Sequence, residues 1–97
     1  MKNLKTARYE LSDEDWERLK PLFQKTLGKL WRTRQEKDRV ILNGLLWKLA
    51  TGAPWRALPK KYGYWGTANQ RLKRLKELGL WRDILAELSK TKTPNQS

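Results

Sequence analysis

The 97-residue sequence contains no cysteine and no histidine. It therefore cannot form disulfides, Cys/His zinc sites or a histidine-based catalytic group. Long apolar runs are also missing: the longest, Val40 to Ala50, is interrupted by Asn43 and Lys48 and is too short to cross a bilayer. No apolar stretch near the N-terminus resembles a signal peptide. These absences predict one small domain in the cytoplasm, away from membranes and associated with the nucleoid if it binds DNA.

Acidic side chains are absent from the middle of the chain. Between Arg39 and Lys76 there are nine Lys or Arg residues and no Asp or Glu, and the whole chain has a formal net charge of +12 at pH 7. Such an imbalance is typical of nucleic-acid surfaces, although ribosomal proteins and membrane-surface peptides share it. Because the stretch has no carboxylate to bind a metal or act as a base, we expect a binding protein with no cofactor and no catalytic residues, not an enzyme.

The spacing of apolar residues predicts an all-α fold, a small bundle of about five helices. The expected helices are residues 12–27, 36–50, 54–62, 67–78 and 81–89. Ser12 can cap the first helix, whose first turn holds three carboxylates, whereas Pro21 is expected to break or kink it after Lys20. Residues 1–10 are expected to form a flexible basic arm, residues 11–89 the helical domain and residues 90–97 a disordered tail.

The short helix, the turn at residues 63–66 and the helix at residues 67–78 follow the plan of a helix-turn-helix, backed by the apolar helix at residues 36–50. In that motif the second helix reads base edges in the major groove, where Asn or Gln suits adenine and Arg suits guanine. The candidates for base reading are Thr67, Asn69, Gln70, Lys73 and Arg74. The candidates for phosphate contact are Arg56, Lys60, Lys61, Arg71 and Lys76.

The six tryptophans could stack on bases, as in single-strand binders, but most lie where a core is expected. Trp16, Trp47 and Trp81 fall on apolar helical faces, and Trp55 and Trp65 bracket the short helix. For these five, packing is the favoured interpretation. Trp31 lies in a basic connector, and the sequence does not determine its role.

Two other basic segments leave alternatives open. Lys2, Lys5 and Arg8 could form a minor-groove arm, although a solvated tail is the simpler interpretation. In the connector and the start of the next helix, the basic residues alternate with Glu36 and Asp38, so part of their charge is expected to be used in i,i+4 pairs. These basic residues are Arg32, Arg34, Lys37 and Arg39.

Several segments resemble family-five bacterial insertion-sequence transposases. They are residues 11–22 (LSDEDWERLKPL), 42–47 (LNGLLW), 51–59 (TGAPWRALP), 65–67 (WGT), the basic helix from Arg71 to Arg74, and residues 79–81 (GLW). In that family this region is an N-terminal helical domain that binds the terminal inverted repeats, and a catalytic domain with a DDE triad and Mg²⁺ follows. The resemblance implies DNA binding but no transposition chemistry, because the sequence stops at Ser97.

Two departures from the family pattern concern the DNA sequence that is bound. Family members often have an aromatic residue and an Arg where Asn69 and Gln70 stand, and residues 28–35 lack the common Gly-Arg-Pro pattern. Sequence-specific binding of double-stranded DNA, at a terminal inverted repeat or an operator, is the expected function. A protein-interaction adaptor and a structured-RNA binder are the alternatives. A homodimer partner and a separately encoded catalytic subunit are further expectations.

Overall fold

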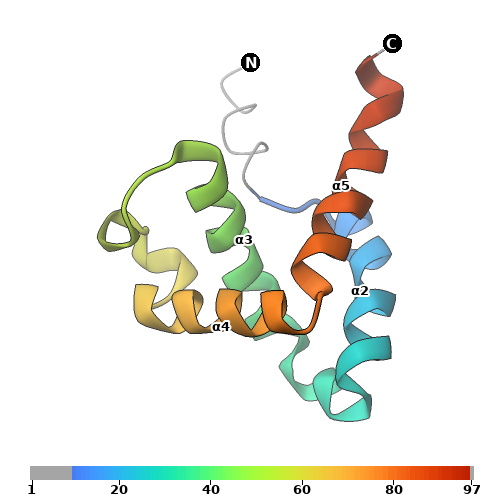
Figure 1. Ribbon diagram of the computed structural model, residues 1–97, viewed down its shortest axis with the longest axis horizontal. Coiled ribbons are helices and arrows are strands. Elements are labelled where there is room, and N and C mark those ends of the chain that lie inside the picture. The colour runs from blue at the N-terminus through green and yellow to red at the C-terminus, as the bar shows by residue number, and fades with distance from the viewer. Residues whose placement is uncertain (1–9, 97) are drawn as a thin grey trace.

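The computed structural model describes residues 10–96, with side chains as far as Lys90. It contains the α-helices α2 (Asp13–Leu27), α3 (Gln35–Thr51), α4 (Trp65–Glu77) and α5 (Leu80–Gln96), and the 3-10 helices η1 (Lys29–Arg34), η2 (Trp55–Ala57) and η3 (Lys60–Tyr62). Over this part of the chain there is no strand, and the predicted all-α fold is confirmed. Figure 1 shows α2 and α5 lying side by side, with α4 running crosswise to the other helices.

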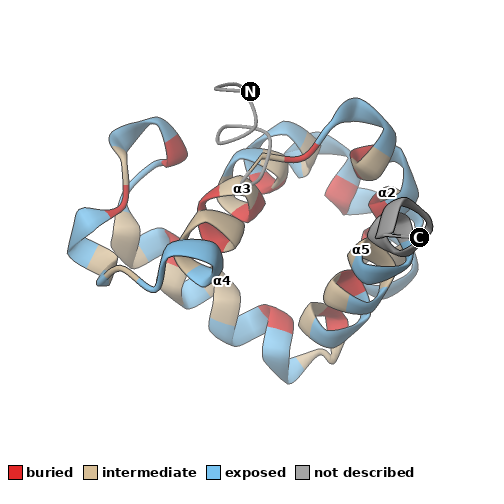
Figure 2. Cartoon of the chain, turned by 90° about the horizontal axis from the view of Figure 1, so that it is seen from above, coloured by how far each residue is buried: buried red, intermediate tan, exposed pale blue. Residues whose placement is uncertain are grey.

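The core lies between the helices, whose buried positions face inward while the exposed positions face outward (Figure 2). Helix α2 contributes Trp16, Leu19 and Phe23. From the other helices come Leu42 and Leu45 of α3, Ala68 and Leu75 of α4, and Leu80 and Ile84 of α5. Each large apolar side chain that is fully buried stabilises the fold by roughly 1.5–3 kcal/mol. The helical spacing in the sequence therefore identified most of the core.

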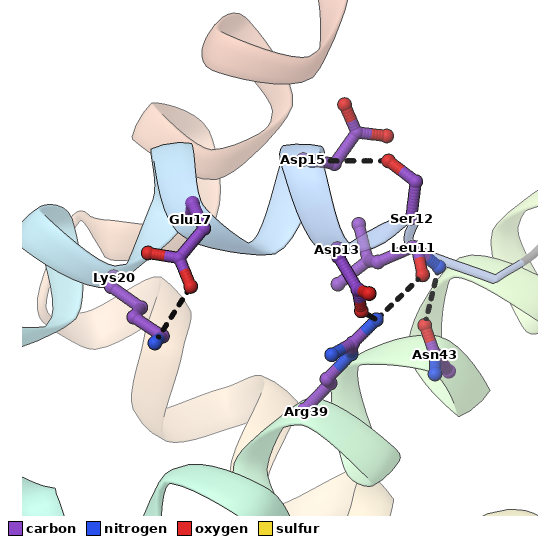
Figure 3. A network of polar contacts seen from close by, with 8 residues as sticks. All are labelled: Leu11, Ser12, Asp13, Asp15, Glu17, Lys20, Arg39 and Asn43. Carbon is purple, nitrogen blue, oxygen red and sulfur yellow. Dashed lines mark hydrogen bonds and ion pairs between the residues drawn. The ribbon is translucent and has the colours of Figure 1, made fainter.

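The beginning of α2 is tied to α3 by polar contacts (Figure 3). Ser12 caps the helix as predicted, its hydroxyl accepting from the Asp15 N–H at 3.0 Å. The Leu11 N–H donates to the Asn43 side-chain oxygen at 2.8 Å. Arg39 donates to the Leu11 carbonyl at 3.0 Å and to the Asp13 carboxylate at 2.9 Å. These bonds hold the start of α2 and the residue before its cap against α3.

The prediction that Pro21 would break α2 is wrong, because the helix continues to Leu27. Proline has no N–H to donate back to the carbonyl of Glu17. Buried side chains lie on both sides of it, however: Leu19 before and Phe23 after. Packing of the two halves against one core holds the helix together across the missing bond, and Pro21 itself is exposed.

The basic connector between α2 and α3, for which no helix was predicted, forms the 3-10 helix η1. Trp31 points from it into the core, where its ring is 1% exposed. The ring stacks on Phe23 at a centroid distance of 4.9 Å and an interplanar angle of 7°. Such a pair contributes about 0.5–1.5 kcal/mol beyond the buried area. Trp31 is therefore a core residue and not a base-stacking platform.

The expected short helix at residues 54–62 is two 3-10 turns, so the domain has four α-helices and not five in its described part. Pro54 precedes η2 and Pro59 precedes η3, both with extended backbone. Pro59 would interrupt an α-helix that started at Pro54, because a proline inside a helix removes a backbone hydrogen bond. The turn before α4 is also shorter than expected, because Trp65 and Gly66 already belong to α4.

Gly44 lets η3 approach α3 closely. A Cβ at this position would lie 2.8 Å from the Cβ of Tyr62, closer than side chains tolerate. Tyr62 is 4% exposed and belongs to the core cluster. The absence of a side chain at Gly44 therefore sets the distance between α3 and the turns that lead to α4.

Other expectations differ in detail. Val40 and Leu49 of α3 are 39% and 59% exposed, so the apolar surface of α3 is only partly covered. Helix α5 continues to Gln96, past the expected end at Ser89. Of the predicted arm, residues 1–9 lie outside the described residues. So do the side chains of residues 91–97 in the predicted tail.

Candidate nucleic-acid interface

Helix α4 lies along one outer side of the molecule (Figure 1), and its exposed side chains are polar or charged. Ala68 and Leu75 bury the opposite face at 1% and 2% exposure. The exposed side chains are Thr67, Gln70, Lys73, Arg74, Lys76 and Glu77, and Asn69 is half-buried. At about 100° per residue, Thr67, Gln70 and Arg74 form one row, whereas Asn69, Lys73 and Lys76 lie on the other side of the exposed face. The structure thus places all five base-reading candidates on one helix, on two adjacent rows.

The first turn of α4 differs from that of α2. Helix α2 begins with a side-chain cap and three carboxylates. Helix α4 has Tyr64 at its N-cap position, with no side-chain cap hydrogen bond and no acid in its first turn. The positive end of a helix attracts anions, and its first N–H groups need partners. The start of α4 is therefore open to an anion in a way that the start of α2 is not.

Asp38 of α3 fixes the position of α4 relative to α3. It is 3% exposed, and it accepts a hydrogen bond of 2.6 Å from the Trp31 indole N–H. Its other oxygen lies 3.1 Å from a guanidinium nitrogen of Arg71 in α4, as an ion pair without hydrogen-bond alignment. Asp38 thus connects η1, α3 and α4 through one buried carboxylate.

This contact gives Arg71 a partner inside the protein. The Arg71 side chain is 19% exposed and its charge is paired with Asp38, so it is poorly placed to contact a phosphate. The expected i,i+4 pairs with Asp38 and Glu36 are not among the ion pairs found: Asp38 binds Arg71, and Arg39 binds Asp13 of α2. Spacing within one helix could not reveal these partners, because they come from other helices.

The turns before α4 carry the remaining phosphate candidates. Arg56, Lys60 and Lys61 are all exposed, but the Lys61 ammonium pairs with the Glu10 carboxylate at 2.9 Å. The Tyr62 hydroxyl donates to the same carboxylate oxygen at 2.9 Å. Local spacing could not reveal this cluster, because Glu10 lies 51 positions from Lys61 and 52 from Tyr62.

The Glu10 cluster changes the titration of its members. Hydrogen bonds from Lys61 and then Tyr62 lower the pKa of Glu10. The hydrogen bond to Glu10 raises the pKa of Lys61. Burial, followed by the hydrogen bond to Glu10, raises the pKa of Tyr62. The cluster is therefore most favourable between the acid range, where Glu10 takes up a proton, and the alkaline range, where Tyr62 loses one.

The basic residues of the acid-free stretch fall into two groups. Five have partners: Arg39 with Asp13, Lys48 with the Ala53 carbonyl, Lys61 with Glu10, Arg71 with Asp38 and Arg74 with Glu77. Four have no hydrogen-bond or ion-pair partner within the described residues: Arg56, Lys60, Lys73 and Lys76. These four, two on α4 and two on the turns before it, are the charges most available to an external anion.

The described residues contain no group of three or more Asp or Glu side chains that could hold a metal ion. In the same part of the chain, every helix is too short or too polar to span a membrane.

Comparisons with known proteins point to one family. A family model described as "Putative transposase of IS4/5 family (DUF4096)" matches residues 11–85. The uncharacterized protein y4sN of Sinorhizobium fredii is 33% identical over 81 residues, which are 82% of this chain and 63% of that protein. The chain thus spans less than two thirds of the length of this relative. No solved structure matches the chain.

Proposed function

The chain belongs to the IS4/5 transposase family, and on that premise we propose that it binds double-stranded DNA in a sequence-specific manner through α4 and the two 3-10 turns before it. The carrying observation is the distribution of charge over this surface. Of its four unpartnered basic residues, Lys73 and Lys76 lie on α4 beside the row of Thr67, Gln70 and Arg74, and Arg56 and Lys60 lie on the turns that precede α4.

The arrangement suits the two kinds of contact that proteins make with DNA, those to phosphates and those to bases. Basic side chains hold the phosphates and position the protein, whereas amide and guanidinium groups read the bases. Gln70 can make a bidentate contact with adenine, and Arg74 with guanine if it leaves its exposed 3.6 Å pair with Glu77. The uncapped start of α4 supports a phosphate contact near Thr67.

The motif would be a helix-turn-helix variant in which 3-10 turns replace the first helix. What the motif needs is a rigid support for the reading helix. Asp38 and Arg71 join α4 to α3, and Gly44 lets η3 pack against α3. From the family resemblance, the target is a terminal inverted repeat, and an operator is the alternative if the chain serves as a regulator. Within this part of the chain the proposed activity is binding, not cleavage.

The test is a selection of duplexes from a randomised pool by the purified chain, followed by affinity measurements on an enriched duplex and a scrambled one. We expect a preference of about 10³-fold or more for the enriched duplex at physiological salt. Equal affinity for both duplexes would contradict sequence-specific binding. A stronger enrichment of structured RNA than of duplex DNA would favour the RNA alternative.

Two sets of variants separate reading from positioning. Gln70→Ala and Arg74→Ala should relax the sequence preference by about 1–3 kcal/mol at their base pairs. Lys73→Ala and Lys76→Ala should weaken binding to all duplexes alike. Lys25→Ala is the matched control: it removes the same charge from an exposed position of α2 and should leave the affinity for DNA nearly unchanged. If Lys25→Ala weakened binding as much as Lys73→Ala, the assigned surface would be wrong.

A further inference from the structure

An exposed aromatic ring stands at the start of α4, and none of the candidate residues accounts for it. The Tyr64 side chain is 67% exposed, the highest value for an aromatic residue among those described. The tryptophans, in contrast, are buried or packed against the core. Exposing a large ring gives up the stability that its burial would contribute. An ordered ring in this position therefore calls for a functional explanation.

Two neighbours hold the Tyr64 ring in place. The ring lies directly over Gly66: a Cβ there would overlap the ring edge, with Tyr64 Cζ at 3.1 Å and Cδ2 at 3.2 Å. On its other side the ring contacts Trp65, with the centroids 5.5 Å apart and the planes inclined by 46°. Glycine is a poor residue for a helix, costing about 0.5–1 kcal/mol relative to alanine. Here it provides the space in which the ring lies.

Beside the ring is a groove of about 390 Å³ with a largely apolar surface. Val40 and Ile41 of α3 and Tyr62 of η3 line one part of it, and Tyr64 and Thr67 line another. Glu36 and Lys37 of α3 also line it, one side chain of each charge. Thr67 belongs both to this groove and to the row that includes Gln70 and Arg74. The groove is therefore continuous with the surface proposed to face DNA.

The chemistry of the major groove identifies an apolar ligand for this site. The base edges there present hydrogen-bond donors and acceptors and one apolar group, the 5-methyl group of thymine. We propose that the Tyr64 ring and the groove beside it receive the methyl group of a thymine in the duplex that α4 contacts. The inference rests on the proposed DNA binding and adds to it a specific base contact.

Deoxyuridine differs from thymidine only by this methyl group, so it is the direct probe. In the duplex enriched by the chain, each thymine is replaced in turn by uracil, and the affinity is measured by fluorescence anisotropy. We expect one position at which the replacement weakens binding about fourfold, as for one buried methyl-sized group. A duplex without a thymine, or with no uracil-sensitive position, would overturn the proposal.

Three variants test the role of the ring. Tyr64→Ala should bind the thymine and uracil duplexes equally, whereas Tyr64→Phe should keep the fourfold discrimination because the hydroxyl takes no part. Gly66→Ala should lose it as well, since the new Cβ displaces the ring, while the helix itself gains stability. Loss of discrimination in Tyr64→Phe would identify a hydroxyl contact instead and overturn the assignment.

The two proposals fail in different ways. If the wild-type chain enriches no duplex, the proposed function is wrong. If it enriches one but Tyr64→Ala discriminates thymine from uracil as the wild type does, only the methyl contact is wrong. Gly66→Ala separates a loss of discrimination from a loss of folding, because its thermal unfolding temperature should equal or exceed that of the wild type. A folded Gly66→Ala with full discrimination would contradict the role of the ring position.

Discussion

At the scale of single residues, one buried carboxylate joins three segments of the domain. Asp38 lies in α3, accepts from Trp31 of η1 and pairs with Arg71 of α4. Its partners lie 7 and 33 positions away, so no local pattern could show the site. Sequence alone predicts Arg71 as an outward-facing phosphate contact. The structure turns it inward because a buried carboxylate needs a charged partner.

Replacing Asp38 tests whether its contacts with Trp31 and Arg71 stabilise the fold. Asp38→Ala should lower the free energy of unfolding by about 3–5 kcal/mol, because it leaves the Arg71 charge and the Trp31 N–H without their partner. Denaturant titration followed by tryptophan fluorescence measures the loss. Glu36→Ala, which removes an exposed acid from the same turn, is the control and should change stability by less than about 0.5 kcal/mol. Equal losses in the two variants would argue against a structural role for the buried carboxylate.

The Glu10 cluster predicts a pH dependence at the acid end. The folded pKa of Glu10 is lowered below its ordinary value of 4.5. The stability that it contributes is therefore fully present above about pH 4.5 and is lost as the pH falls through the folded value. The side chain is 32% exposed, so solvent screens the contribution, which we expect to be below about 1 kcal/mol.

Glu10→Gln should therefore be slightly less stable than the wild type at pH 7, and the difference should be smaller at pH 3. Denaturant titrations at both pH values measure it. Glu14→Gln is the matched control, since Glu14 has no side-chain partner among the described residues. A difference that grew as the pH fell would have the wrong sign for a carboxylate whose pKa is lowered by its partners.

At the scale of elements, helical periodicity predicted α2, α3 and α4 and most of their buried faces. It worked because apolar residues at spacings of three and four must meet a core. It failed where the chain depends on distant packing. Pro21 lies inside α2 because Leu19 and Phe23 are both buried. Thr67, Gln70, Lys73 and Arg74 are exposed on α4, whereas the groove beside Tyr64 needs α3, η3 and α4 together and was not predictable.

The approach of η3 to α3 gives a prediction whose sign separates packing from helix propensity. Propensity alone says that Gly44→Ala should stabilise α3 by about 0.5–1 kcal/mol. The new Cβ would lie 2.8 Å from the Cβ of Tyr62, which is too close to the backbone to move freely. We therefore expect a net destabilisation of about 1–3 kcal/mol.

Thermal or denaturant unfolding of Gly44→Ala is best compared with Gly66→Ala. Both add the same methyl group to a helix, but the second meets only a side-chain ring that can move. Opposite signs for the two variants are expected. If Gly44→Ala were as stable as Gly66→Ala, the close approach of η3 to α3 would not constrain the fold.

At the scale of the whole molecule, the net charge of +12 overstates what is available to a polyanion. Within the acid-free stretch, residues from outside it neutralise part of the charge: Glu10, Asp13, Asp38 and Glu77. The four basic residues of the stretch that keep no partner among the described residues lie on α4 and the turns before it. Outside the stretch, further exposed basic residues lie on other elements: Lys25, Lys29, Arg32, Arg34, Lys37 and Arg82.

This accounting predicts the salt dependence of DNA binding. Four unpartnered basic residues, Arg56, Lys60, Lys73 and Lys76, give about four phosphate contacts and a slope of log K against log salt near −3.6, since each contact contributes about −0.9. If all nine basic residues of the stretch bound phosphates, the slope would be near −8. Affinity measured by anisotropy over a series of salt concentrations distinguishes the two values.

Glu10 supplies the matched test of this count. Glu10→Gln removes the carboxylate that pairs with Lys61 at 2.9 Å and should release one more cation to the DNA. We expect tighter binding at low salt and a slope steeper by about 0.9, whereas Glu14→Gln should leave the slope unchanged. A wild-type slope near −8 that Glu10→Gln does not alter would mean that DNA displaces the internal ion pairs. In that case the partners seen in the free domain would not limit its DNA surface.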